Sequence, residues 1–152
     1  MIQRIQTLFL LGALFVLALM LFMPLAEILT DDSTYFYVMS AGLRLENGEF
    51  VQRTWPVFIL ILITSVLIFL NILLYRNRKL QIRFCVYSIV LGFGMIGLLY
   101  YYWVNIFRQL DVDSYWLRIP LIFPVIAIIF VYLAFRAIRK DEILIRSIDK
   151  IR

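Results

Sequence analysis

The sequence contains no histidine and only one cysteine, Cys85. Without histidine, the chain cannot by itself build a His-ligated haem, a His-based zinc site, or a Ser-His-Asp or Cys-His catalytic unit. One cysteine forms neither an internal disulfide nor a cysteine-based metal centre. A P-loop is also missing. Gly92, Gly94 and Gly97 have the spacing of GxGxxG, but they lie in an apolar stretch with no strand before them and so do not form a dinucleotide-binding fingerprint. We therefore expect a protein that is not an enzyme and carries no cofactor or metal, and we interpret these glycines as helix-packing residues.

Charged residues are also scarce, at 16% of the chain, where about 25% is usual in soluble domains. Hydrophobic residues make up 64% of the 152 residues, against roughly 45–50% in soluble domains. The length allows one domain of ordinary size, so a polar second domain cannot be hidden in this average. The composition excludes a soluble globular domain and indicates a single integral membrane domain over residues 1–152.

Apolar runs of membrane-spanning length occur four times. Four stretches without Asp, Glu, Lys or Arg are 17 to 24 residues long, and about 20 residues of helix cross the hydrocarbon core. The first run exceeds the length of a signal-peptide core, which favours a retained helix. We predict an all-α membrane protein, an up-down-up-down bundle of four transmembrane helices at about residues 6–28, 55–75, 84–106 and 118–138.

Basic residues are distributed unevenly over the two ends of these spans. If the N-terminus is cytoplasmic, eleven Lys and Arg residues lie on the inner side and four on the outer side. Cytoplasmic flanks of membrane proteins carry the excess of basic residues, so we expect both termini inside. Trp55, Trp103 and Trp116 then lie near the outer interface, where amphipathic rings are favoured.

The outer loop, residues 29–54, is expected to contain a small β structure. Residues 43–51 are typical of a β-hairpin, since Asn47-Gly48 suits a type I′ turn and apolar residues alternate beside it. Residues 35–39 add a possible third strand. Because an isolated hairpin is marginal in water, the second outer loop, residues 108–118, is a candidate support.

Two prolines lie inside the predicted spans near their outer ends. We expect Pro24 and Pro124 to interrupt backbone bonding and to bend their helices. This is either simple punctuation of the helix ends or the basis of an outward-facing cavity.

Candidate binding residues fall into an inner and an outer group. The outer group is Glu27, either solvated or paired with Arg118, Arg53 or Arg108. The tail, residues 139–152, is expected to form an amphipathic cytoplasmic helix that lies on the bilayer or on a partner. The basic inner loop would attract anionic headgroups. The candidate lipid or partner contacts of the inner group are Arg76, Arg78, Lys79, Arg83, Arg139, Lys140, Ile145 and Ile148.

Three stretches carry a resemblance to a known family. They are residues 1–7 (MIQRIQT), residues 75–85 (YRNRKLQIRFC) and residues 136–152 (RAIRKDEILIRSIDKIR). The chain resembles the small four-span membrane proteins of Bacteroidota catalogued as domain of unknown function 4293. The resemblance implies a bacterial multi-pass inner-membrane protein and supplies no catalytic residue, cofactor or substrate.

Two functions remain open at this point. The first is a non-catalytic accessory or scaffolding subunit of a larger inner-membrane assembly. Its partners would be other membrane subunits and lipids with anionic headgroups, and not nucleic acid. The alternative is a small transport or lipid-handling protein with an outward-facing cavity.

Overall fold

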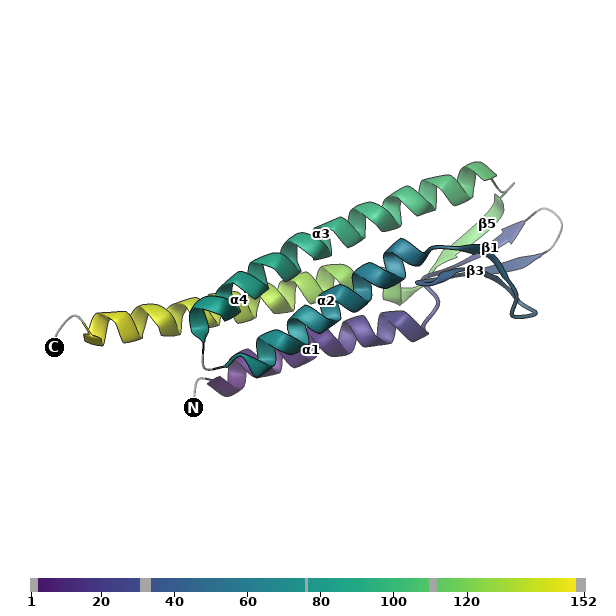
Figure 1. Ribbon diagram of the computed structural model, residues 1–152. Coiled ribbons are helices and arrows are strands. Elements are labelled where there is room, and N and C mark those ends of the chain that lie inside the picture. The colour runs from purple at the N-terminus through teal and green to yellow at the C-terminus, as the bar shows by residue number, and fades with distance from the viewer. Residues whose placement is uncertain (1–2, 31–33, 76, 110–111, 150–152) are drawn as a thin grey trace.

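The computed structural model describes residues 3–30, 34–75, 77–109 and 112–149. Within them lie four long helices and a small sheet at one end (Figure 1). All four helices are long and apolar enough to cross a membrane. The helices are α1 (Gln3–Phe22), α2 (Trp55–Leu73), α3 (Arg78–Gln109) and α4 (Phe123–Asp149).

The helices lie side by side, and each contacts two others. Helices α1 and α3 both pack against α2 and α4. In each helix the buried residues recur at the three- and four-residue spacing that places them on one face. In α1, for example, this face consists of Leu10, Ala13, Leu17 and Met20. The core of the helical part is built from these four faces.

Small residues set how closely α3 and α4 approach. A Cβ atom added to Gly92 would lie 2.6 Å from Cγ1 of Ile128 in α4, so the missing side chain is what allows the contact. The prediction that glycines pack helices together is therefore confirmed for Gly92. It is wrong for Gly97, whose added Cβ would meet nothing within 4 Å.

The outward surfaces of the helices are also apolar. Leu8 is 66% exposed, Val90 63% and Phe93 62%, each on a different side of its helix from the core face. Monomeric soluble proteins rarely expose apolar surface this extensive. The pattern of a packed interior and an apolar exterior fits helices that are solvated by lipid.

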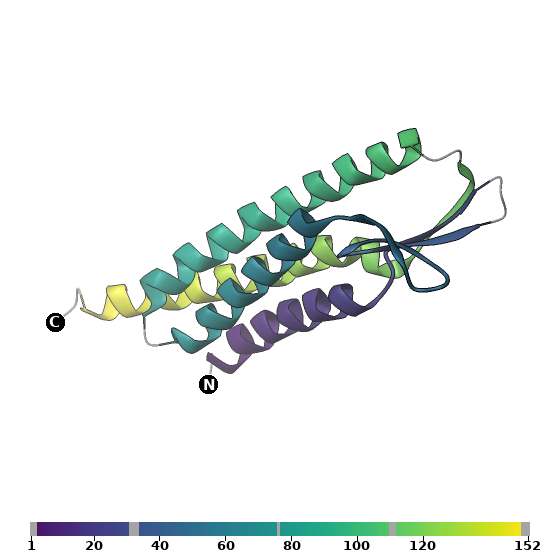
Figure 2. The same cartoon turned by 45° about the vertical axis from the view of Figure 1, so that its right-hand side comes forward.

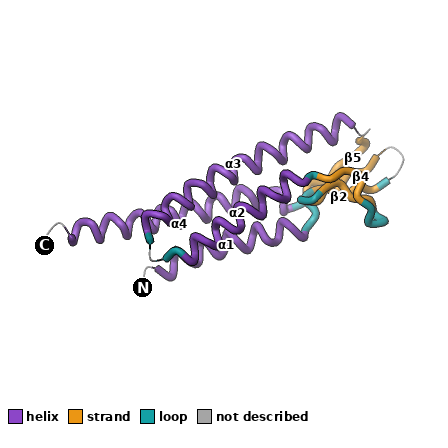
Figure 3. The backbone as a smooth tube through the Cα atoms, in the orientation of Figure 1, coloured by secondary structure: helices purple, strands orange, loops and turns teal. Residues whose placement is uncertain are grey.

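The sheet has five antiparallel strands in the order β4-β3-β2-β1-β5 (Figure 3). Strand β1 pairs with β2 on one side and with β5 on the other, so the two loops predicted to be outer form one structure. The strands are β1 (Ala26–Thr30), β2 (Tyr35–Met39), β3 (Gly42–Leu45), β4 (Phe50–Arg53) and β5 (Val112–Leu117).

The predicted hairpin and its third strand are present as β3, β4 and β2. The predicted turn type is wrong. The Gly48 N–H donates to the Leu45 carbonyl and Leu45 N–H to the Glu49 carbonyl, which leaves three loop residues instead of two. Gly48 has φ 94°. A type I turn followed by a left-handed glycine is the usual form of a three-residue hairpin loop.

The first helix is shorter than predicted. It ends at Phe22, and residues 26–28, which the predicted span included, belong to β1. Pro24 lies in the connection between them and bends no helix. Pro124 is the second residue of α4, where a missing N–H does no harm. The expectation that both prolines bend their helices is therefore wrong.

The tail is not a separate helix that turns onto a bilayer surface. Helix α4 continues without a break from Phe123 to Asp149. Its last turns project beyond the first residues of α1, along the direction of α4 (Figure 2). The charged residues at 139–142 do not end the helix, because Arg, Lys and Glu are good helix formers.

Candidate functional site

The C-terminal end of α3 holds the sheet. Helix α3 has 32 residues and α1 has 20, and a rise of about 1.5 Å per residue makes α3 about 18 Å longer. Its last turns bury Ile106 among Ala26, Ile28, Val38 and Leu43. One face of the sheet is therefore fixed to the protruding part of α3.

Aromatic rings strengthen this attachment. Trp103 and Phe107 of α3 have ring centroids 4.9 Å apart, and Tyr115 of β5 lies 5.8 Å and 5.2 Å from them. Two of the three pairs are edge-to-face, an arrangement that aromatic quadrupoles favour. The three rings join the second outer loop to α3.

The opposite face of the sheet carries one cross-strand row that combines aromatic and charged residues. The register places Glu27 opposite Trp116 and Tyr37, and places Arg44 opposite Tyr37 and Phe50. The two ends of the row are open to the surroundings, since Trp116 is 49% and Phe50 47% exposed. We call these five residues the outer row: Trp116, Glu27, Tyr37, Arg44 and Phe50.

Glu27, the predicted outer polar residue, is paired with Arg118. A guanidinium nitrogen of Arg118 donates to Oε1 of Glu27 over 2.6 Å. The Arg118 side chain is 53% exposed and the Glu27 side chain 20%. Of the other predicted partners, Arg53 lies with its guanidinium carbon 6.0 Å from the Trp55 ring centroid. An ion pair this exposed adds little stability, and its charges remain accessible to a ligand.

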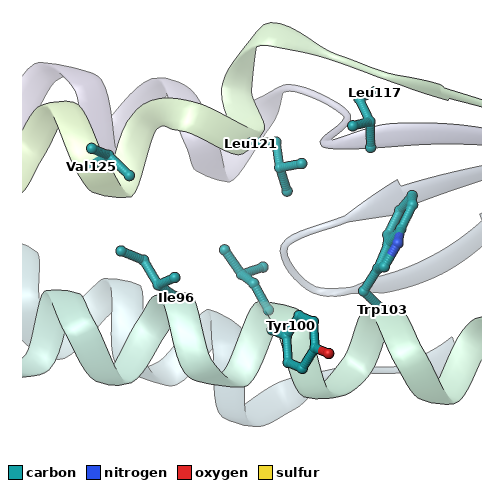
Figure 4. A pocket seen from close by; sticks show the side chains of 7 residues that line it. Ile96, Tyr100, Trp103, Leu117, Leu121 and Val125 are labelled. Atoms are coloured by element: carbon teal, nitrogen blue, oxygen red, sulfur yellow. The ribbon is translucent and has the colours of Figure 1, made fainter.

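A groove lies between α3 and the start of α4 (Figure 4). Its volume is about 240 Å³. One wall comes from α3, and the other from β5, the short helix η1 (Ile119–Ile122) and α4. The lining residues are Ile96, Leu99, Tyr100, Trp103, Leu117, Leu121 and Val125. This lining suits an apolar chain and offers no group for acid–base or metal chemistry.

A cavity between helices bent at proline was considered from the sequence. The groove is the hollow that comes nearest to this expectation, but it forms in another way. Bent helices do not form it. It lies where Leu117 of β5, Leu121 of η1 and Val125 of α4 face α3. Its position followed from tertiary packing and was not indicated by the prolines.

A polar layer crosses the helices at the end opposite the sheet. One buried polar side chain comes from each helix: Gln6, Asn71, Gln81 and Asp141. The Gln6 amide donates to the Asp141 carboxylate, which links α1 to α4. Gln81 donates to the Asn71 carbonyl over 3.0 Å, and Asn71 donates to Sγ of Cys85 over 3.1 Å, which links α2 to α3.

Sequence reasoning missed Gln6, Gln81 and Asp141 in this layer. The available signal was spacing: Gln6 continues the core face of α1 by one turn below Leu10, and Asp141 continues that of α4 below Ile138. Buried polar side chains that bond across helices join membrane helices. The arrangement is structural, and it marks the end of the apolar core.

The basic residues predicted as inner contacts lie around this polar end. Lys79 and Arg83 are exposed on the first turns of α3, with Arg78 partly exposed beside them. Arg139 and Lys140 are exposed on α4. Arg76 lies outside the described residues, and so do the side chains of Ile145 and Ile148, whose backbones belong to α4.

Comparison with known proteins gives one match. The sequence model of a family described as "Domain of unknown function (DUF4293)" matches residues 2–151. No curated protein and no solved structure matches the chain.

Proposed function

The chain belongs to the DUF4293 family over essentially its whole length, and we propose that it acts by binding, as a non-catalytic subunit of a larger membrane assembly. The observation that carries this proposal is the five-stranded sheet. One face of the sheet is fixed to α3, while the outer row on the other face ends in two half-exposed aromatic residues. Aromatic residues and arginine are the types enriched at protein interfaces.

The proposal places the helices in a bacterial inner membrane as an up-down-up-down bundle. Exposed Lys79, Arg83, Arg139 and Lys140 support a cytoplasmic position for the end opposite the sheet. Both termini are then cytoplasmic, and the sheet faces the outer side. The basic residues at the inner end would also bind anionic headgroups, at roughly 1 kcal/mol each.

The last turns of α4 form a second surface for a partner on the cytoplasmic side. Because α4 projects past α1, these turns are reached from several sides (Figure 1). The alternation of Leu144, Ile145 and Ile148 with charged residues supports an amphipathic face. A subunit with surfaces at both ends of its spans would join partners across the membrane.

The rival hypothesis is a small transport or lipid-handling protein, and transport requires a path between the helices. The cavity between Thr64 and Ser88 measures about 10 Å³, and a single water needs roughly 10–15 Å³. A cavity of this size favours the binding role over transport.

The test is copurification after extraction in a mild detergent. A stoichiometric partner is expected with the wild-type chain. Replacing both Trp116 and Phe50 by Ser should reduce its recovery at least fivefold, because aromatic anchors near an interface centre contribute about 2 kcal/mol or more. The matched control is Tyr75→Ser, which removes an aromatic residue that is 58% exposed at the other end of α2. Equal recovery from both variants would remove the outer row as the docking surface.

A further inference from the structure

A second groove lies where the edge strand β4 leads into α2. Its volume is about 320 Å³, which exceeds the roughly 150 Å³ of an apolar cavity that holds benzene. Unlike the groove between α3 and α4, it has a charged side chain in its own lining. The lining residues are Ala41, Phe50, Arg53, Trp55 and Phe58. We call it the Arg53 groove.

A β-bulge brings Phe50 and Arg53 to the same face of β4. Side chains alternate between the two faces of a regular strand, so residues three apart would point in opposite directions. The pairing with β3 skips Val51, which is therefore an extra residue in β4. Arg53 lies opposite Gly42, which has no side chain to cover it. The guanidinium is therefore open to a ligand from this face, and Arg53 is exposed.

The Arg53 groove crosses the end of the apolar span of α2. This span begins at Trp55, two residues after Arg53. Trp55 and Phe58 therefore belong to the part of the groove that lies in the span, and Arg53 to the part just outside it. A ligand that fills the groove needs an apolar part beside Phe58 and a polar part beside Arg53. Phospholipids have this structure, and a membrane supplies them at this depth.

Arg53 determines which charge that polar part should carry. Its guanidinium carbon lies 6.0 Å from the centroid of the Trp55 ring, at the limit of a cation–π contact. Among the residues that the structure describes, it has no ion-pair partner. Glu46 and Glu49 of the neighbouring hairpin loop do not line the groove. The groove therefore presents an unbalanced positive charge with a guanidinium fork, which binds phosphate through two parallel hydrogen bonds.

We propose that the Arg53 groove binds one phospholipid of net negative charge. The phosphate accepts hydrogen bonds from Arg53, and the first part of an acyl chain packs on Trp55 and Phe58. A zwitterionic lipid fits less well, because its ammonium would lie near Arg53 with no carboxylate among the lining residues. The site requires only that α2 crosses a membrane, and not that the chain is a subunit.

The experiment reconstitutes the full chain into phosphatidylcholine vesicles with a trace of phosphatidylglycerol that carries a photoreactive group near the start of one acyl chain. After illumination, the labelled residues are mapped by mass spectrometry. Labelling is expected to concentrate on Trp55 and Phe58. Phe22 is 80% and Ile119 75% exposed at the same end of the helices, and even labelling of all four residues would overturn the proposal.

A second probe tests the charge of the ligand. Phosphatidylcholine that carries the same photoreactive group at the same position should label Trp55 and Phe58 less than the phosphatidylglycerol probe does. Equal labelling by the two probes contradicts the preference for a net negative charge.

Two variants and one control test the groove itself. Arg53→Gln removes a charge-assisted hydrogen bond, which corresponds to about a tenfold loss of Phe58 labelling. Ala41→Phe narrows the groove without changing its charge and should also lower the labelling. The matched control is Arg118→Gln, which removes an arginine that is paired with Glu27 and does not line the groove, and should leave the labelling unchanged.

An equal loss in Arg53→Gln and Arg118→Gln would assign the labelling to the general positive charge at this end of the helices, and would contradict the site. Unchanged labelling in both Arg53→Gln and Ala41→Phe would contradict it as well. Normal membrane levels and a single elution peak of each variant show that it is folded.

Discussion

The contact between α3 and α4 allows a matched pair of glycine substitutions on one helix. Gly92 and Gly97 both lie in α3, but an added Cβ would lie 2.6 Å from Ile128 at Gly92 and would meet nothing within 4 Å at Gly97. Alanine in place of glycine stabilises a helix by about 0.5–1 kcal/mol at either position. Overpacking a close contact costs about 1–3 kcal/mol, and this cost applies at Gly92 alone.

The difference between Gly92→Ala and Gly97→Ala therefore isolates the packing cost. The helix-propensity gain is common to both variants and cancels, which leaves about 1–3 kcal/mol. For a chain of this size, 1 kcal/mol shifts the melting temperature by about 2–4 °C. Gly97→Ala should melt at or above the wild-type temperature, and Gly92→Ala about 2–12 °C below Gly97→Ala.

The assay is thermal unfolding of the purified chain in mild detergent, with circular dichroism and loss of the monodisperse peak as two readouts. Ile128 is β-branched and stiff, so it does not move aside without strain. Equal melting temperatures for the two variants would refute the close packing of α3 on α4. A Gly97→Ala variant less stable than Gly92→Ala would refute the assignment of the two helix faces.

Three further predictions concern the two ends of the molecule. Gly48→Val places a β-branched residue at φ 94° with its Cβ 3.0 Å from Nη2 of Arg44, so partner copurification should fall while membrane level holds; unchanged recovery would separate the hairpin from docking. Gln6→Leu leaves the buried Asp141 carboxylate without the Gln6 hydrogen bond and should destabilise the chain in detergent by about 1–3 kcal/mol. Adding Asp141→Asn should restore part of the lost stability. If Gln6→Leu leaves the stability unchanged, the polar layer does not stabilise the chain. In the tail, Ile148→Asp should abolish partner copurification if α4 packs on a partner, and Lys150→Ala should not; wild-type behaviour of both would leave the tail without a docking role.

The helices were largely predictable, because uninterrupted apolar runs report directly on membrane-spanning length. The second span, predicted at 55–75, is found as Trp55–Leu73, where Pro56 fits the first turn. The errors in the predicted spans lie at the helix ends. Ala26 and Ile28 are apolar for a reason that composition does not distinguish from membrane insertion, because they are buried between the sheet and α3.

The sheet was predictable where its pairing is local. The Asn47-Gly48 turn and the alternation beside it indicate β3 and β4. Strand β5 was not predicted, because its partner β1 lies more than 80 residues away in the sequence and its Tyr115 packs on Trp103 and Phe107 of α3. Long-range pairing of this kind leaves no local signal.

The candidate sites also differ in whether a local sequence pattern indicates them. The Glu27–Arg118 pair was one of several pairings that charge alone allowed, and packing selected it. The groove has no sequence signature, since its lining residues are ordinary for a membrane helix and form a groove only where β5, η1 and α4 lie beside α3. The polar layer could have been predicted from helical spacing. Polar residues that continue the spacing of a buried apolar face should be assigned to that face as well.

The central claim is that the chain crosses the membrane four times, with the sheet outside and the basic end inside. Single cysteines at Asn47, Ser114, Asn77 and Ser147, introduced into a Cys85→Ser background, test it directly with a membrane-impermeant thiol reagent. Positions 47 and 114 should react in intact cells, and positions 77 and 147 only after the membrane is permeabilised. Labelling of position 77 in intact cells would contradict the whole arrangement.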